Sequence, residues 1–276
     1  INKAISSIKE KKFNITDISS KVVNRNPYGP FTTSTLQQVA SSRLGFGASR
    51  TMQIAQKLYQ GIEIEGETIG LITYMRTDGT NLSKDAVSTF RDYIKKEIGK
   101  EYLPENALNY SGKKAKNAQE AHEAIRPTDI IRTPQSVKKY LSTDQNKLYD
   151  LIWSRALSSQ MESAKFDRNT ITISSNNNDT ICKASGSVLK FDGFLKIYNN
   201  PSKDDDNESI LPAMTKGLVN IEALLDEQHF TQPPPRYSEA SLVKKLEELG
   251  IGRPSTYASI ISTIANRGYA EILNKR

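Results

Sequence analysis

The spacing of apolar residues divides the chain into a helical part and a part with strand periodicity. Between residues 28 and 162, apolar residues recur every three or four positions, as on the buried face of an amphipathic helix. From about Phe166 the repeat falls to two, and a polar turn is expected at residues 176–179. A helical pattern returns after Ser238. The order predicts an α+β protein of more than one domain.

The helical part begins with two short predicted helices. Ser34 is expected to cap the first helix, which ends at Gly45. Ser49 is expected to cap the second, which ends at Gly61. The two form a helix-turn-helix-like unit, an arrangement that often contacts DNA but is also an ordinary packing unit.

A strand and further helices are predicted after this pair. The run TIGLITYM at residues 68–75 is rich in β-branched residues and too short for a typical helix, which predicts a strand. Ser83 is expected to cap a helix that ends at Gly99. Another helix is expected through Leu148 and Ala156.

Charge is distributed unevenly along the chain. The formal net charge is +7, and residues 1–60 alone hold nine Lys and Arg against Glu10 and Asp17. A basic segment suits a polyanion, because cations that neutralise phosphates release condensed counterions. A basic surface that only keeps the protein soluble would have the same composition. Charge alone therefore leaves two interpretations of this segment, a nucleic-acid-binding surface and a solubilising surface.

Other features of the composition narrow the class of protein. The apolar runs are too short for a membrane span or a signal peptide, so a cytoplasmic protein with no membrane partner is expected. The single cysteine, Cys182, excludes an internal disulfide and a cysteine-rich zinc finger. The acidic run at residues 204–206 reads as a solvated loop. The ends at Ile1 and Arg276 suggest a piece of a longer protein.

The most informative cluster is TYMRTD at residues 73–78, at the end of the predicted strand. Alternate side chains of a strand share a face, so Tyr74 and Arg76 are expected together, with Cα atoms about 7 Å apart. A phenol is a weak nucleophile until it is deprotonated or polarised, and a guanidinium stabilises charge on a reacting phosphate. The pair suits attack on a phosphate, although a tyrosine in a β-rich segment is ordinarily a packing residue.

A second cluster is QEAHEAIRP at residues 119–127. His122 and Arg126 are four residues apart, which places them on one face of a predicted helix that Pro127 ends. Together they would form a cationic pair for a phosphate. A histidine that only caps or packs at the helix end is the alternative.

A third cluster is GIGRPST at residues 250–256. Its glycines allow the backbone to approach a ligand, while Arg253, Ser255 and Thr256 offer donors near a helix N-terminus. A plain turn capped by Ser255 would need no ligand. No GxxxxGK[ST] motif is present, and residues 45–50 depart from the dinucleotide fingerprint, so no ATP is implied.

Together these motifs carry a family resemblance. TYMRTD, AHEAIRPT and GIGRPSTYASII, preceded by PFTTSTLQQ at residues 30–38 and RTMQIAQKLY at residues 50–59, resemble the bacterial type IA DNA topoisomerases over nearly the whole chain. The resemblance implies an isomerase that relaxes negatively supercoiled DNA without ATP. In that family a tyrosine cuts one strand and holds its 5′-phosphate as a phosphotyrosine ester, another strand passes, and the break is resealed.

The resemblance also implies roles for individual residues. Tyr74 matches the nucleophile and Arg76 the transition-state stabiliser, while Asp78 and His122 match positions beside the scissile phosphate. Gly79 stands where the family often has serine, which removes one hydroxyl contact. The residues expected to bind DNA are Arg126, Arg253, Ser255, Thr256, Arg43 and Arg50.

The same resemblance implies a domain plan with a missing part. Residues 1–27 and 163–240 would form a β-rich hinge or arch, residues 28–162 the helical tyrosine-bearing domain, and residues 241–276 the start of a gate-base domain that binds single-stranded DNA. The rest of the gate base and a Toprim domain with the Mg²⁺ site are expected in cis, outside this chain. No metal is therefore expected here, and the chain alone is expected to be inactive.

Two other functions compete with this interpretation. The chain could be a non-enzymatic helix-turn-helix module that binds DNA, with Tyr74 purely structural. A tyrosine recombinase also forms a DNA phosphotyrosine, but it attaches the 3′-phosphate and places its tyrosine near the C-terminus. The order of motifs here does not fit that family. For the topoisomerase, the expected partner is a single-stranded segment of supercoiled DNA in the bacterial nucleoid.

Overall fold

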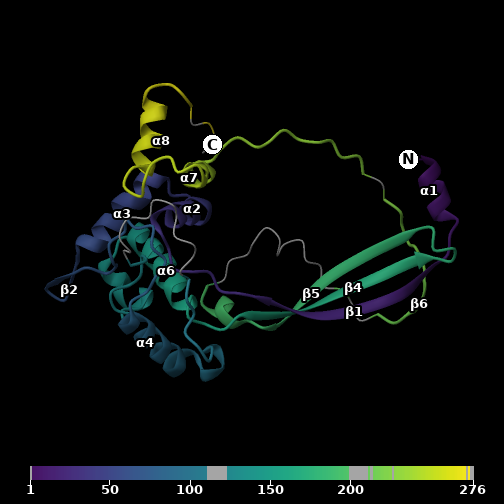
Figure 1. The fold of residues 1–276 in the computed structure, drawn as a ribbon, viewed down its shortest axis with the longest axis horizontal. Coiled ribbons are helices and arrows are strands. Elements are labelled where there is room, and N and C mark those ends of the chain that lie inside the picture. The colour runs from purple at the N-terminus through teal and green to yellow at the C-terminus, as the bar shows by residue number, and fades with distance from the viewer. Residues whose placement is uncertain are drawn as a thin grey trace. The chain divides into compact units, whose positions relative to one another are not determined.

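The computed structural model describes residues 2–110, 123–198, 211, 214–225, 227–271 and 273. The chain divides into two compact units, Ile1–Asn26 with Ser163–Pro234 and Pro27–Glu162 with Pro235–Arg276. The first unit is dominated by strands and the second by helices (Figure 1). The predicted α+β class is confirmed. No helix in the described ranges combines the length and the apolar character needed to cross a membrane.

The first unit contains an antiparallel sheet with the strand order β5-β4-β1-β6. Its three long strands run side by side (Figure 1). Most side chains on β1 and β5 are exposed, so backbone hydrogen bonds carry the pairing along much of these strands. The elements are α1 (Asn2–Lys9), β1 (Phe13–Arg25), β4 (Ala164–Ser175), β5 (Ile181–Phe191), η4 (Gly193–Lys196) and β6 (Gly217–Val219).

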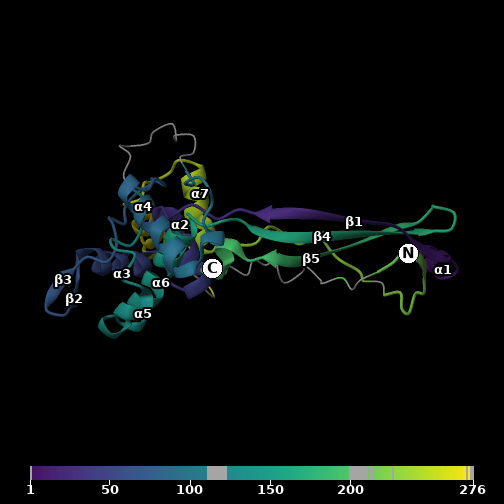
Figure 2. The same cartoon turned by 90° about the horizontal axis from the view of Figure 1, so that it is seen from below.

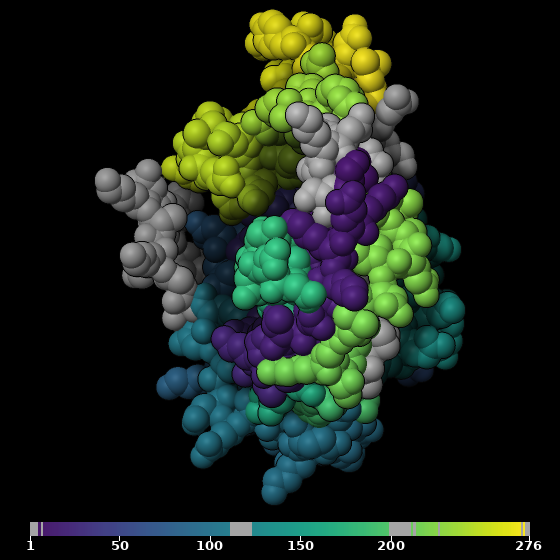
Figure 3. Space-filling view, turned by 90° about the vertical axis from the view of Figure 1, so that its right-hand side faces the viewer, coloured from purple at the N-terminus to yellow at the C-terminus, as the bar shows by residue number. Residues whose placement is uncertain are grey.

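One end of this sheet is held together by polar side chains around the β4–β5 turn. Lys11 Nζ lies 2.8 Å from Asp179 Oδ2, and Asn14 Nδ2 donates to Asn176 Oδ1 at 2.8 Å. In the surface view the purple start of β1, the teal-green turn and the light-green β6 lie next to one another (Figure 3). The turn predicted at residues 176–179 is confirmed.

The second unit gathers its helices around the buried helix α6. Leu148, Ile152 and Ala156 of α6 are fully buried, and the Trp153 indole N–H donates to Ile130 O at 3.0 Å. Figure 2 shows the short β2–β3 hairpin after α3. The elements are α2 (Thr33–Leu44), α3 (Ala48–Gln60), β2 (Ile62–Ile64), β3 (Glu67–Ile69), α4 (Lys84–Tyr93), η1 (Ile94–Ile98), η2 (Lys100–Tyr102), α5 (Pro134–Val137), η3 (Lys138–Tyr140), α6 (Thr143–Ser158), α7 (Glu239–Glu248) and α8 (Tyr257–Asn266).

The caps predicted for α2 and α3 are wrong by two residues. Thr32 caps α2, because Thr32 and Thr35 bond each other's backbone and side chain in a capping box. Ser34 is the second residue of the helix, and its hydroxyl donates instead to Glu247. Gly47, not Ser49, precedes α3, and it supplies no capping side chain. The predicted cap at Ser83 is confirmed.

Helices α7 and α8 pack against α2 and α3. Val243 and Leu246 of α7 and Tyr257 and Ile261 of α8 form a buried apolar cluster with Ala48 at the start of α3. Burial of these side chains fixes α7 and α8 on the helical unit. Their assignment to the start of a gate-base domain stays a prediction.

Candidate active site

The segment TYMRTD is extended but is not a strand, so the strand predicted at residues 68–75 is wrong beyond Ile69. Its successive backbone groups bond to different elements. Leu71 N–H donates to Leu58 O at 2.8 Å, and Thr73 N–H donates to Arg126 O at 2.9 Å. Among the described residues, no single neighbouring strand continues the ladder, and the bridge that forms at this segment joins Ile72 with Pro127. The segment is nevertheless tied down on both sides.

Exposure along this segment alternates as a strand would require. Met75 and Thr77 are each 1% exposed, whereas Tyr74 is 43% exposed and Arg76 and Asp78 also reach solvent. In the part of the chain that the structure describes, neither the Tyr74 hydroxyl nor the Arg76 guanidinium makes a hydrogen bond or ion pair. A phenol, a guanidinium and a carboxylate therefore face outward from a backbone whose intervening residues are buried.

Two threonine hydroxyls hold the backbone on either side of Tyr74. Thr73 Oγ1 donates to Ala124 O at 2.8 Å and accepts from Arg126 N–H at 3.0 Å. Thr33 Oγ1 donates to Met75 O at 2.7 Å and accepts from Thr77 N–H at 2.8 Å. Such bonds satisfy backbone groups that are otherwise buried, and they restrict where the exposed side chains point.

The second cluster joins this site in an unexpected conformation. The helix predicted across residues 119–127 is wrong at its C-terminal end, where residues 123–127 are extended. Ile125 bridges with Phe31, and Ala124 N–H donates to Asn81 O at 2.8 Å, so the backbone groups bond across to other segments. His122 lies outside the described residues, and its role stays a prediction.

Arg126 is held by its own neighbours. Its Nε and Nη2 donate to the two oxygens of Glu123 at 2.6 and 2.9 Å, and Nη1 donates to Pro127 O at 2.9 Å. Burial alone would raise the pKa of Glu123, but hydrogen bonds from Arg126 and from Ser83, with the Arg126 charge, lower it overall. A phosphate at Arg126 would have to compete with a bidentate carboxylate. DNA binding by Arg126 stays a prediction.

Charged groups of the GIGRPST loop and of the TYMRTD segment both influence the phenol of Tyr257, the first residue of α8. Burial raises the pKa of Tyr257, the Glu247 carboxylate raises it further, the Arg253 guanidinium opposes these effects, and the Asp78 carboxylate adds to them. Charges from both clusters therefore act on one phenol. The structure thus brings together residues that are far apart in the sequence.

The geometry of this loop depends on Gly252. Its φ is +80°, and an added Cβ would lie 2.8 Å from Ile260 Cδ1. Arg253 N–H donates to Thr256 Oγ1 at 2.8 Å, which closes the turn before α8. The residue that caps α8 is Thr256 and not Ser255, which is exposed. Arg253 is also exposed, as a residue that binds an external anion must be.

The two arginines of the first helix pair differ in their surroundings. Arg50 is paired with Asp144 at 2.5 Å, and its guanidinium lies 4.6 Å from the Phe46 ring centroid. Arg43 is half-buried in the last turn of α2. DNA binding at both positions stays a prediction.

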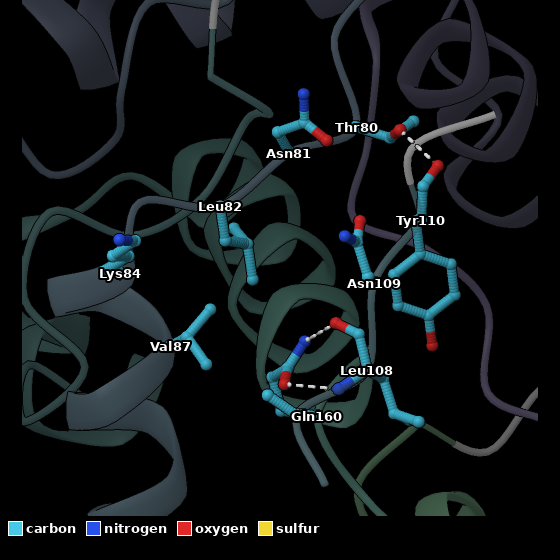
Figure 4. Close-up of a pocket in the computed structure, with 10 residues that line it drawn as sticks. Thr80, Asn81, Leu82, Lys84, Val87, Leu108, Asn109, Tyr110 and Gln160 are labelled. Carbon is cyan, nitrogen blue, oxygen red and sulfur yellow. Dashed lines mark hydrogen bonds between the residues drawn. The ribbon is translucent and has the colours of Figure 1, made fainter. Parts of the chain in front are cut away.

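A hollow of about 430 Å³ is lined partly by residues that follow Asp78 in the sequence (Figure 4). The Gln160 amide fixes one wall, because Nε2 donates to Leu108 O at 2.9 Å and Oε1 accepts from Leu108 N–H at 3.2 Å. Thr80 Oγ1 donates to Tyr110 O at 2.8 Å. Neither Tyr74 nor Arg76 lines this hollow. The lining residues are Thr80, Asn81, Leu82, Lys84, Val87, Ala107, Leu108, Asn109, Tyr110 and Gln160.

Within the described ranges, no group of three or more His, Cys, Asp or Glu side chains is arranged to hold a metal ion. Asp78 therefore belongs to no such group among the described residues. The described residues do not fit a resident metal.

The sequence did not identify two residues that contact the TYMRTD segment and restrict its position. Thr33 lies within the stretch PFTTSTLQQ, but nothing in its spacing distinguishes it from the neighbouring threonine. Tyr59, in the last turn of α3, packs edge-on against Tyr74 with ring centroids 5.4 Å apart and an interplanar angle of 67°. Only the folded chain brings these positions together.

Comparison with known proteins agrees with this arrangement. The sequence profile of the DNA topoisomerase family matches residues 1–276. The chain therefore belongs to the DNA topoisomerase family, and the predicted membership of its bacterial type IA group is confirmed.

Individual relatives show how much of the family the chain represents. DNA topoisomerase 1 of Rickettsia typhi is 51% identical over 272 residues, which cover 98% of this chain and 35% of that protein. DNA topoisomerase 1 of Salmonella typhimurium is 47% identical over 274 residues, covering 99% of this chain and 30% of that protein. The structure of full-length topoisomerase I from Thermotoga maritima matches with a TM-score of 0.83 and 38% identity, covering all of this chain and 44% of that one. The chain spans about a third of the length of the curated relatives it matches.

Proposed function

We propose that this chain carries the nucleophile of a type IA DNA topoisomerase, which relaxes negatively supercoiled DNA by cutting and resealing one strand without ATP. The observation that carries the proposal is the exposed pair Tyr74 and Arg76 on a segment whose alternate residues, Met75 and Thr77, are buried. Family membership supplies the context for that pair.

The proposed chemistry is a reversible transesterification at Tyr74. The phenol loses its proton, and its oxygen attacks the phosphorus of a DNA phosphodiester. An oxygen–phosphorus bond forms to Tyr74 while the bond to the 3′-oxygen breaks, and the departing oxygen takes up a proton to become a 3′-hydroxyl. The 5′-phosphate stays on the protein. Because one ester replaces another, resealing is the reverse attack and needs no ATP.

Arg76 is the group proposed to stabilise the reacting phosphate. Its guanidinium has no partner in the described part of the chain, so it meets phosphate oxygens without first breaking an ion pair. A planar guanidinium donates two parallel hydrogen bonds to phosphate, and its charge offsets the charge that builds on the oxygens. Asp78, on the same exposed side, is proposed to lie beside the scissile phosphate.

DNA contacts away from Tyr74 are proposed for the loop between α7 and α8. Arg253 and Ser255 are exposed beside the N-terminus of α8, where backbone N–H groups favour an anion. The ligand is a single-stranded segment of supercoiled DNA in the bacterial cytoplasm. Thr256 closes the same loop and holds Arg253 in place.

The complete protein is proposed to supply what this chain lacks. Mg²⁺ and a Toprim domain would assist departure and return of the 3′-oxygen, and the described residues of this chain offer no site for the metal. The chain alone is therefore expected to show no plasmid relaxation with Mg²⁺. Relaxation by the purified chain would contradict the proposal that the metal and the Toprim domain are required.

The nucleophile is tested with Tyr74→Phe in the complete protein. Cleavage of a single-stranded oligonucleotide is expected to be lost, because only the attacking oxygen is removed. Tyr237→Phe is a matched control, since it removes another exposed phenol hydroxyl from the same unit. Unchanged cleavage by Tyr74→Phe would leave Tyr74 structural and favour a non-enzymatic DNA-binding module.

A further inference from the structure

Thr33 connects the start of α2 to the backbone around Arg76. It is the first residue of α2, and it is fully buried. Its hydroxyl proton is shared between Met75 O at 2.7 Å and Thr77 O at 3.1 Å, and its oxygen accepts from Thr77 N–H at 2.8 Å. Its own N–H donates to Thr77 O at 2.9 Å. One side chain thus engages backbone groups on both sides of Arg76.

These contacts determine which way Arg76 points. With Met75 and Thr77 drawn toward Thr33, their side chains are buried, and the residue between them faces solvent. Within the described residues, the Arg76 guanidinium has no side-chain partner of its own. The backbone at residues 75–77 is therefore the main restraint on its position, and Thr33 holds that backbone.

We infer that Thr33 is a positioning residue for Arg76, and this inference rests on the proposed function. Its hydroxyl holds residues 75–77 so that the guanidinium meets the phosphate while Tyr74 attacks. A displacement of about 1 Å of a group that acts on the transition state costs on the order of 100-fold in rate. Thr33 touches no substrate and acts only through the backbone of Met75 and Thr77.

The first test compares threonine variants in the complete protein. Thr33→Val keeps the shape of the side chain but removes its hydroxyl, whereas Thr33→Ser keeps the hydroxyl. Single-turnover cleavage of an oligonucleotide is expected to fall tenfold or more with Val and less than threefold with Ser. The Kd for an uncleavable oligonucleotide should change less than twofold, because the restraint acts on the reacting geometry.

Thr51→Val is the matched control. Thr51 is also fully buried in the same unit, but its hydroxyl donates to Gly47 O at 3.0 Å, at the start of its own helix α3. Its loss should leave the cleavage rate within twofold. Equal losses at Thr33 and Thr51 would show a general effect of removing buried hydroxyls and would overturn the inference. Circular dichroism is used to choose an assay temperature at which every variant is folded. If Thr33→Val does not fold, Thr33→Ala takes its place.

A double-mutant comparison tests whether Thr33 acts through Arg76. If it does, Thr33→Val should slow cleavage less than twofold once Arg76 is already alanine, because nothing remains to be positioned. The same tenfold loss in both backgrounds would overturn the inference. If Tyr74→Phe still cleaves, the proposed function fails; if only the Thr33 effects are missing, that function stands and the positioning role alone is wrong.

Discussion

The hydroxyl of Ser34 donates a hydrogen bond of 2.6 Å to the carboxylate of Glu247, which joins the first turn of α2 to α7. At the other end of α7, the Glu239 carboxylate accepts from Ala48 N–H, also at 2.6 Å. The first turn of a helix has unpaired N–H groups and a positive end of its dipole. Two carboxylates of one helix therefore fix α7 at the N-termini of α2 and α3.

The Glu239 contact should contribute to the stability of the helical unit. Glu239→Gln is expected to lower the free energy of unfolding by about 1 kcal/mol, because it removes the charge from a charge-assisted bond at the start of α3. Trp153 is the single tryptophan and is buried in this unit, so its fluorescence during urea denaturation reports the change. Glu248→Gln is the control, since Glu248 pairs with the exposed lysines Lys244 and Lys245, and it should shift stability by less than about 0.5 kcal/mol.

A second prediction concerns Gln37 on α2. Its side chain is 1% exposed, and its amide nitrogen and oxygen lack hydrogen-bond partners in the part of the chain that the structure describes. Buried polar groups without partners are costly, so Gln37→Met should raise the free energy of unfolding by about 1 kcal/mol. The readout is the urea midpoint of Trp153 fluorescence. A loss of stability would mean that the amide is satisfied and would contradict the prediction.

A third prediction concerns pH and the sheet end around the β4–β5 turn. Hydrogen bonds from Lys11 and then from Ser175 lower the pKa of Asp179 to about 2. A lowered carboxyl pKa stabilises the fold above the unfolded value of about 4, and the contribution is lost as pH falls toward 2. The protection of amides near the turn against hydrogen exchange, taken relative to the intrinsic exchange rate at each pH, should therefore fall over this range. The fall should be absent in Asp179→Asn, and the same fall in that variant as in the original protein would contradict the assignment.

The fold was predictable where local signals agree. The period of two identified the sheet and its turn, and capping signals placed α4 and α7, because Ser83 and Ser238 satisfy N–H groups of their own helices. The cap of α3 was not predictable, since Glu239 reaches it from 191 residues away. The extended conformation around Arg126 was also not predictable from the sequence, because its backbone hydrogen-bond partners come from distant segments.

The site was predictable only in part. Alternation predicted that Tyr74 and Arg76 share a face, and the structure shows both side chains exposed although the segment is not a strand. Thr33 and Tyr59 were missed because their roles arise from contacts made across the fold. The sequence motifs supply the candidate residues for chemistry, whereas the structure shows what holds those residues in place.

The central claim is that Tyr74 becomes covalently bound to the 5′-phosphate of a cut DNA strand. In the complete protein, the cleavage product with an end-labelled single-stranded oligonucleotide is trapped by denaturation and digested, and the modified peptide is sequenced by mass spectrometry. We expect one adduct, on Tyr74, carrying a 5′-phosphoryl nucleotide, and a free 3′-hydroxyl on the released strand. A 3′-phosphoryl adduct, or modification of another residue such as Tyr59, would contradict the claim.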